Sequence, residues 1–465
     1  MSGIQPAVAA GHPATAAAGA EILADGGSAA DAAVASVLAS CVAETVMTGL
    51  LGGGHAIYWD AARRTARNLD CFVAVPGLGA DPRQAELVHL DVPFGEELVH
   101  YAVGPASCGT PGVPAGLDAL WQEHGRLPWP RLVEPALAIA RTGVNMPAAH
   151  AACLSMLAPV MTLDAGARIY APGGALLQTG GRLLQPGLVP ALEAISLEGA
   201  ASVYTGSVGE ALLELSDERG GLLTREDLVT YAATWSEPVR VDALGWAFAT
   251  RGDLSGIPDA VTSWPASFGR TAAEHTLSLV DVLRAPDVHG DTTNITVADA
   301  DGNACVITTS LGLGSGDFIP GLDLHLNSML GEADLIRGSL MPGTRMSSMM
   351  APTLAFDRAG ELELAVGAAG GTRLRTALLY STLGILDQGM EPQDAVERPR
   401  FHPAGDVINA EPGVDEDALS ALEQRGWAVR RWPARHHYFG GVSLVSRRGA
   451  AADPRRSGLV AMPRP

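Results

Sequence analysis

The sequence predicts an α+β protein in which two stacked sheets lie between outer layers of helices. Small-residue helical patterns fill residues 12–44, strand patterns dominate from Thr292 to Gly371, and helical patterns return after Arg373. Long antiparallel pairings covered by helices are typical of a four-layer αββα sandwich. The chain has 465 residues, and neither a fixed-period repeat nor a clear linker divides it.

The individual elements follow from periodicity and from glycine and proline positions. Residues 12–44 predict two alanine-rich helices, of which Gly26 or Gly27 ends the first and Ser28 caps the second. In the rest of the chain we expect strands over 56–59, 67–72 and 237–241, mainly helix over 111–240, a variable connection of weak periodicity over 253–291, and helices over 373–386 and 415–425.

The most informative pattern is a hairpin that begins at Thr292. Two β-prone runs, 292–299 and 303–310, flank the three-residue loop Ala300-Asp301-Gly302, whose glycine suits the left-handed position of such a loop. This loop pairs Asp299 with Asn303. Counting outward from that pair predicts that Ser310 lies opposite Thr292 on the same face of the hairpin.

Thr292 has two interpretations. A Thr-Thr pair at a strand start is ordinary β-branched strand material. Cutting the chain between Asp291 and Thr292, however, would give Thr292 a free α-amine beside its own hydroxyl. Such an amine titrates at about 7.7–8.0, so at neutral pH it could accept the hydroxyl proton during attack on a carbonyl.

Composition excludes several classes of function. The net charge is -20, which argues against nucleic acid or an anionic membrane as a partner. The chain has no lysine, which excludes a pyridoxal Schiff base. The five cysteines include no CxxC pair and the histidines lack ligand spacing, so we expect neither metal nor cofactor. The first residues do not resemble a signal peptide, and we expect a cytoplasmic protein.

Short motifs follow one another along nearly the whole chain. They are His12-Pro13, Gly26 to Ala33, Gly52-Gly53-Gly54, Pro111 to Gly116, Tyr204-Thr205-Gly206, Gly220 to Leu228, Asp291-Thr292-Thr293, Leu326-Asn327, Ser347-Ser348-Met349, Gly370 to Arg373 and Pro399 to His402. In this order they resemble the γ-glutamyltranspeptidase family of N-terminal nucleophile hydrolases. The resemblance implies an αββα fold and a precursor that cuts itself before Thr292. The fragments, residues 1–291 and 292–465, would remain one unit as a heterodimer.

The same resemblance assigns roles to site residues. Thr292 would be the nucleophile, Ser310 would orient it, and the backbone of Gly370 and Gly371 would form the oxyanion hole. Ser347 and Ser348 would donate hydrogen bonds to the substrate. From the residues alone, Ser310 could equally end a strand, and the two glycines could simply precede a helix.

The predicted substrate clamp departs from the family pattern. Phe72 stands where the family has an arginine that binds the glutamyl α-carboxylate, and a phenyl ring cannot replace a guanidinium there. Gly312 replaces an asparagine. Glu332, or alternatively Asp334, replaces the aspartate that holds the α-amino group. Arg345 is a candidate for a compensating anion contact.

These observations predict a working threonine-nucleophile enzyme with a changed small-molecule substrate. The first interpretation is an amide-cleaving acylase or γ-glutamyl-like hydrolase or acyltransferase. A second resembles the branch of the family that cleaves a carbon–carbon bond in actinomycete pathways to alkylproline antibiotics. A third is a non-catalytic binding protein that has kept the fold.

Overall fold

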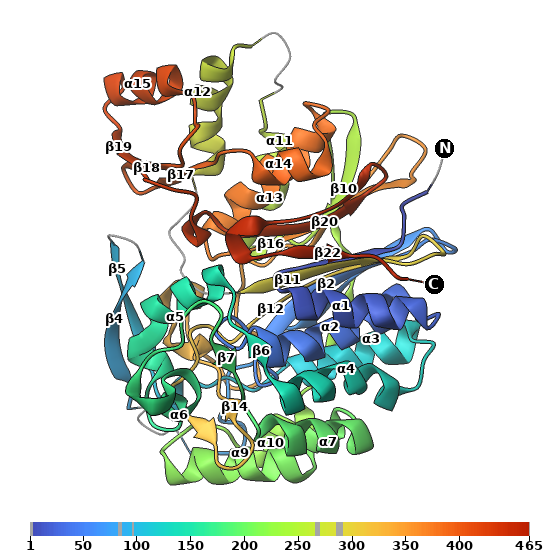
Figure 1. Cartoon of the computed structure of the whole chain (residues 1–465), viewed down its shortest axis with the longest axis vertical. Helices are drawn as coiled ribbons and strands as arrows, with labels where there is room; N and C mark the ends of the chain where they lie inside the picture. Colours follow the sequence, from blue (N-terminus) through green and yellow to red (C-terminus); the bar gives the residue numbers. More distant parts are fainter. Residues whose placement is uncertain (1–2, 82–85, 95–96, 266–269, 285–291, 465) are drawn as a thin grey trace.

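A computed structural model describes residues 3–81, 86–94, 97–265, 270–284 and 292–464. Its centre is formed by two antiparallel sheets stacked face to face (Figure 1). The first has the order β22–β1–β11–β12–β2–β3–β8, with bounds Leu459–Ala461, Ala7–Ala10, Thr293–Ala298, Ala304–Ser310, Gly53–Asp60, Thr65–Cys71 and Thr234–Ser236. The second has the order β21–β20–β16–β15–β10–β9, with bounds Gly449–Ala452, Gly441–Ser446, Leu362–Ala369, Thr353–Phe356, Trp246–Thr250 and Val239–Ala243.

Helices cover both outer faces, which confirms the predicted αββα sandwich. The helices on the side of the first sheet include α1 (Pro13–Ala24), α2 (Ala29–Ala43), α3 (Val113–His124), α4 (Trp129–Thr142) and α7 (Leu188–Glu198). The second sheet is covered by α11 (Ile257–Thr262), α13 (Arg373–Leu386) and α14 (Pro392–Glu397) (Figure 1).

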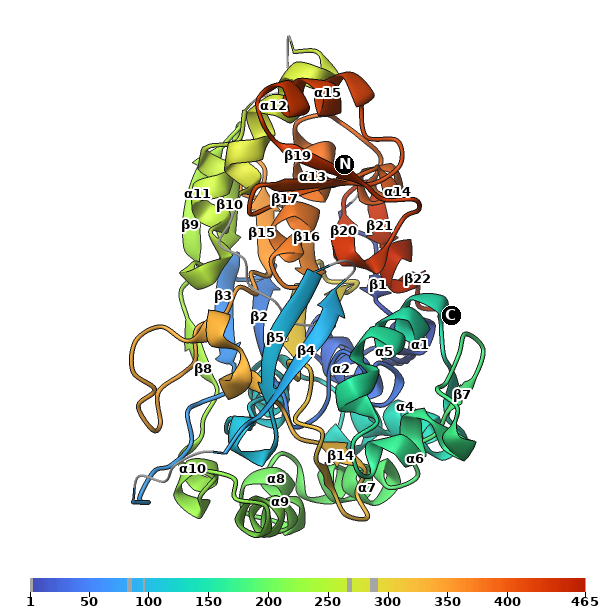
Figure 2. The same ribbon diagram turned by 90° about the vertical axis from the view of Figure 1, so that its left-hand side faces the viewer.

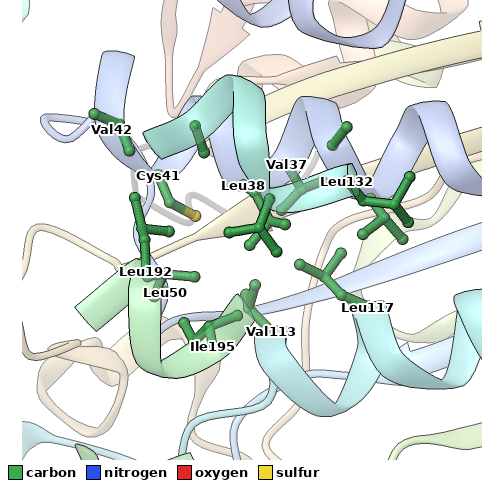
Figure 3. Close-up of a cluster of buried hydrophobic side chains, with 14 of the residues drawn as sticks. Val37, Leu38, Cys41, Val42, Leu50, Val113, Leu117, Leu132, Leu192 and Ile195 are labelled. Carbon is green, nitrogen blue, oxygen red and sulfur yellow. The ribbon is translucent and has the colours of Figure 1, made fainter. Parts of the chain in front are cut away.

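The predicted alanine-rich helices form, and their composition explains how closely they pack. Every residue of α2 is buried, and Ser28 caps it in a reciprocal capping box with Asp31. Small side chains allow α2 to lie against both α1 and the first sheet. Its other face meets α3, α4 and α7 in an aliphatic core that includes Leu38, Leu117 and Leu132 (Figure 3).

Five further helices lie within residues 111–240, the stretch predicted to be mainly helical. They are α5 (Ala148–Met161), α6 (Gly166–Tyr170), α8 (Ala201–Tyr204), α9 (Ser207–Glu218) and α10 (Arg225–Thr230). An arm of two strands, β4 (Val88–Phe94) and β5 (Glu97–Val103), crosses the front of the molecule in Figure 2. Within the described ranges no helix is long and apolar enough to cross a membrane.

The described part of 253–291, expected to be a variable connection of weak periodicity, contains α11 and also α12 (Ala272–Leu283). Helix α12 packs on α15 (Glu416–Gln424), beside a small sheet of β17 (Phe401–Ala404), β18 (Val407–Ala410) and β19 (Ala428–Arg431). The two short helices are stabilised by packing that their weak periodicity did not reveal.

Candidate active site

The hairpin register brings Thr292 and Ser310 together as predicted. Strand β11 pairs with β12 from Thr293 opposite Thr309 to Ala298 opposite Ala304. Extending this register by one residue places Thr292 level with Ser310. Both side chains line the same narrow cavity, so the counting from the turn holds over the whole length of the hairpin.

Thr292 is held at the start of β11, next to the end of β16. Its side chain is 5% exposed, and its Oγ1 accepts a hydrogen bond of 2.8 Å from the backbone N–H of Gly370. An oxygen that attacks a carbonyl from this position would develop the adjacent oxyanion close to backbone donors. Asp291, on the other side of the predicted cleavage point, lies outside the described residues.

Gly370 and Gly371 adopt conformations that depend on glycine. Their φ angles are +123° and +58°. A Cβ on Gly370 would lie 2.8 Å from Cα of Gly440, closer than such atoms approach in proteins. The two glycines therefore let the turn between β16 and α13 pass close to Thr292 while one amide points at its hydroxyl.

The narrow cavity gathers most of the predicted site residues. Six of them line it, and Gly370 is bonded to Thr292 from the adjoining turn. Ser347 is half-buried and is not among the lining residues, so its role stays a prediction. The full lining is Phe72, Thr292, Ser310, Met329, Glu332, Leu335, Ser348, Met349, Met350 and Gly371.

Phe72 forms a fixed apolar wall of this cavity. Its backbone N–H donates to Asp70 Oδ1 at 2.9 Å, and its carbonyl accepts from the Tyr231 hydroxyl at 2.6 Å. Phe72 is 1% exposed, and its ring stacks on His55 with the ring centres 5.4 Å apart. Burial keeps the pKa of His55 well below its usual value, so the wall is uncharged at neutral pH.

Arg345 does not provide the anion contact that the cavity lacks. Its guanidinium lies 4.1 Å from the ring centre of Tyr231, and its Nε is 3.4 Å from Asp70. It also donates to the carbonyl of Ala232 and lines a separate cavity with Tyr231. A substrate bound at Thr292 would meet Phe72 in place of a cation.

Glu332 occupies the space beside Gly312. The Glu332 side chain is 4% exposed and lines the cavity, whereas Asp334 does not. A Cβ on Gly312 would lie 2.4 Å from Glu332 Oε1 and 2.7 Å from Ser328 Oγ. Gly312 also has a φ of +70° and donates its N–H to Ser310 Oγ at 2.8 Å. The lack of a side chain at Gly312 thus leaves the space that the Glu332 carboxyl group occupies.

Ser348 is positioned by a polar network behind the cavity. Its N–H donates to Asp253 Oδ2 at 2.7 Å, and its carbonyl accepts from Arg251 Nη1 at 2.9 Å. Its Oγ accepts the N–H of Met350 at 3.2 Å. Arg251 and Asp253 are themselves paired at 2.9 Å, so Ser348 sits on a braced turn.

The sequence interpretation missed Glu44, which lies on the other side of β11. Both of its carboxyl oxygens accept hydrogen bonds, from Thr15 and from Thr293, the residue after Thr292. A signal was present, because Glu44 is the only Asp, Glu or Arg between Asp31 and Asp60. Burying an ionisable group in an apolar stretch is costly unless it is hydrogen-bonded or paired, so an isolated glutamate there points to specific partners.

No group of three or more His, Cys, Asp or Glu side chains in the described part of the chain is arranged to hold a metal ion. Burial lowers the pKa of His437 well below its usual value, and His402 receives or donates a bond of 2.8 Å with Thr376. These histidines are therefore part of the packed interior.

Comparison with known proteins decides the family. Residues 15–257 and 259–462 match the gamma-glutamyltranspeptidase family. The chain belongs to this family. As a gamma-glutamyltranspeptidase family member, it is an enzyme of the hydrolase and acyltransferase class.

Relatives within the family differ in the reactions that their names describe. The chain is 28% identical to an Acylase ACY 1 proenzyme of Pseudomonas sp. strain SE83, over 96% of this chain and 90% of the relative. It is 26% identical to the glutathione hydrolase proenzyme of Bacillus subtilis strain 168, over the same shares, 96% and 90%. The cephalosporin acylase from Bacillus halodurans has the same fold, with a TM-score of 0.83, 22% identity and coverage of 99% and 96% of the two chains.

Proposed function

We propose that the chain is a self-processing amide hydrolase or acyltransferase whose nucleophile is Thr292. The observation that carries this proposal is the hydrogen bond of 2.8 Å from Gly370 N–H to Thr292 Oγ1, at the wall of a cavity. The relatives named proenzymes support processing of the chain, and the position of Thr292 at the start of β11 supports a cut before this residue. Residues 1–291 and 292–465 would then stay together as a heterodimer.

The cut chain has the groups that acyl transfer requires. The α-amine of Thr292 takes the proton from Oγ1 as this oxygen attacks the substrate carbonyl. Backbone N–H groups at Gly370 and Gly371 stabilise the oxyanion. The amine then returns the proton to the leaving group, and the acyl-enzyme passes to water or to an acceptor amine. Ser310 and Ser348 position the nucleophile and the substrate.

The substrate we propose has an apolar or flat acyl group and is held by few charged contacts. Phe72, Met329, Leu335, Met349 and Met350 supply apolar walls, whereas Glu332 supplies the one acidic side chain of the cavity lining. An amino group would be held near Glu332. A free α-carboxylate would find no guanidinium among the described residues that line this cavity, because Arg345 faces another cavity.

The nucleophile is tested by intact mass spectrometry and turnover. Wild-type protein should give two fragments that meet between Asp291 and Thr292, and Thr292→Ala should remain one inactive chain. Thr292→Ser keeps a hydroxyl and should still be cut. An uncut wild-type protein that turns over substrate would overturn the mechanism, and a folded, uncut, inactive wild type would indicate a binding protein instead.

The substrate class is tested by steady-state kinetics on paired anilides. We expect weak turnover of a γ-glutamyl anilide and faster turnover of an aromatic or aliphatic acyl anilide that lacks the α-carboxylate. A lost charged hydrogen bond costs about 1.5–3 kcal/mol, which corresponds to tenfold to over a hundredfold in affinity. Efficient γ-glutamyl turnover that Phe72→Arg does not improve would show that the clamp works by other contacts.

A further inference from the structure

Glu44 connects the helical layer to the strand that starts at the nucleophile. It follows α2 directly and its side chain is 0% exposed. Thr15 on α1 donates its hydroxyl to Oε1 at 2.6 Å, and Thr293 on β11 donates its hydroxyl to Oε2 at 2.6 Å. One carboxyl thus joins two helices of the outer layer to the first paired residue of β11.

The surroundings of Glu44 leave it little freedom. A Cβ on Gly11 would lie 2.8 Å from Glu44 Oε2 and 3.1 Å from Thr293 Oγ1. The backbone of Gly11 is therefore packed closely against both hydrogen-bonded side chains. The nearby Arg456, which donates to Met47 Sδ at 3.2 Å, contributes positive charge. Burial raises the pKa of Glu44, and the two hydroxyl donors and Arg456 oppose that change.

Thr292 and Thr293 point to opposite faces of the sheet. Successive side chains in a strand alternate, so Thr292 reaches Gly370 in the turn that follows β16, whereas Thr293 reaches Glu44 in the helical layer. On the helix-facing side, Thr309 opposite Thr293 is held by Thr48, hydroxyl to hydroxyl at 2.8 Å. The start of the hairpin is therefore fastened to the helices just behind the nucleophile.

Such an anchor matters because chain ends tend to fray. If the chain is cut before Thr292, that residue becomes the end of β11 and loses its covalent restraint on one side. The first residue that pairs with β12 is Thr293. A displacement of about 1 Å at a reacting group can cost about a hundredfold in rate.

We infer that Glu44 is a positioning residue that holds the free chain end carrying the nucleophile, through its hydrogen bond to Thr293. Its carboxyl oxygens accept hydrogen bonds from Thr15 and Thr293, so it acts on the nucleophile through the neighbouring residue. This inference rests on the proposed function, because only a cut chain has a free end at Thr292. It predicts that losing the Thr293 hydroxyl lowers kcat and leaves KM nearly unchanged.

The test compares Thr293→Val with Thr15→Val. Both substitutions remove one hydroxyl donor from the same buried carboxyl at similar volume, but only Thr293 belongs to the nucleophile's strand. We expect kcat to fall about ten- to a hundredfold in Thr293→Val and less than threefold in Thr15→Val. Thr293→Ser keeps the hydroxyl and should restore kcat. Equal kcat in the two valine variants would overturn the inference.

A second measurement does not depend on turnover. Hydrogen exchange of the backbone amides of residues 293–298, followed by mass spectrometry, should be faster in Thr293→Val than in Thr15→Val. Equal exchange in the two variants would contradict the anchoring role of Glu44, whether or not the wild type is active or cut. A wild type that is inactive or uncut would contradict the proposed function instead. If Thr293→Val does not fold, Thr293→Ala takes its place in both comparisons.

Discussion

Gly370 combines a backbone conformation that depends on glycine with an N–H that donates to Thr292, and the proposed mechanism uses both. Alanine there would have to adopt a φ of +123° and place its Cβ 2.8 Å from Cα of Gly440. We expect Gly370→Ala to shift the N–H away from Thr292 and to lower kcat by about 10²–10³, the usual cost of one lost oxyanion donor. Steady-state kinetics on folded, cut protein provides the measurement.

Gly449 offers a matched control for this substitution. Its φ is +136°, and no atom lies within 4 Å of the position that a Cβ would take. Gly449→Ala carries the same kind of backbone strain far from Thr292 and should keep normal kcat. Similar kcat in the two alanine variants would mean that Gly370 serves folding alone.

Gly312 controls the position of Glu332. A methyl group on Gly312 would lie 2.4 Å from Glu332 Oε1, so Gly312→Ala should push the carboxylate out of its place. We expect KM for an amino-bearing acyl anilide to rise about tenfold, while KM for the matching anilide without the amino group changes little. An equal rise for both substrates would contradict a contact between Glu332 and the amino group.

At the scale of elements, Asp299 joins the hairpin turn to a helix. Its Oδ1 accepts the N–H groups of Asp301 and Asn303, both at 3.0 Å, and its Oδ2 accepts the N–H of Ala29 at the start of α2, at 2.9 Å. Asp299→Ala leaves several buried donors without this partner. Each unsatisfied group costs about 1–3 kcal/mol, so we expect a total loss of about 3 kcal/mol or more in the free energy of unfolding.

Asp301, two residues away, provides the comparison for that measurement. Its side chain is 60% exposed and pairs with Arg126 at 2.6 Å on the surface. Exposed ion pairs contribute about 0–1 kcal/mol. Denaturant titration should therefore separate Asp299→Ala clearly from Asp301→Ala, and similar midpoints for the two would refute the joining role of Asp299.

The same elements show what local sequence can and cannot specify. The register of β11 and β12 was predictable because a three-residue loop with Gly302 fixes the pairing, and every later pair follows by counting. Helix α12 was missed although Thr271 and Glu274 form its capping box. The helix packs on α15, which comes more than a hundred residues later in the chain, and local sequence does not show this contact.

The site shows the same limit. Two cavity residues could be predicted for different reasons. Ser310 lies opposite Thr292 in the same hairpin, and Gly371 belongs to a motif whose place in the family order is recognisable. The direction of Arg345 was not predictable, because Tyr231 and Ala232 attract its guanidinium from a distant segment. Glu44 was missed for a similar reason, since its bond to Thr293 spans 249 residues.

At the scale of the whole molecule, buried histidines should make the fold sensitive to acid. Burial lowers the pKa of His12 to about 4 and the pKa values of His150 and His325 to about 3, from 6.5. The unfolded chain therefore binds more protons than the folded one between about pH 6.5 and pH 4. Stability is full above this window and falls with pH inside it, by up to about 1.4 kcal/mol per pH unit for each histidine.

Urea unfolding at pH 7.5, 6 and 5 measures this dependence. His325→Gln keeps a group that can accept the N–H of Gly316, which His325 Nε2 accepts at 2.9 Å, but it cannot be protonated. Its free energy of unfolding should fall less steeply with acid than that of the wild type. Parallel slopes for the two proteins would mean that the pKa of His325 does not differ between the folded and the unfolded state.

The interleaved sheets have a consequence for the kinetics of assembly. In the first sheet β11 lies between β1 and β12, and in the second β16 and β20 share a sheet with β9 and β10, so each sheet contains strands from both sides of residue 292. If the chain is cut before Thr292, neither fragment could complete a sheet alone. Renaturation of the cut enzyme would become a bimolecular encounter whose half-time shortens as protein concentration rises. The uncut Thr292→Ala protein would renature at a rate independent of concentration. Processing would therefore slow refolding in dilute solution without preventing the folded fragments from staying together.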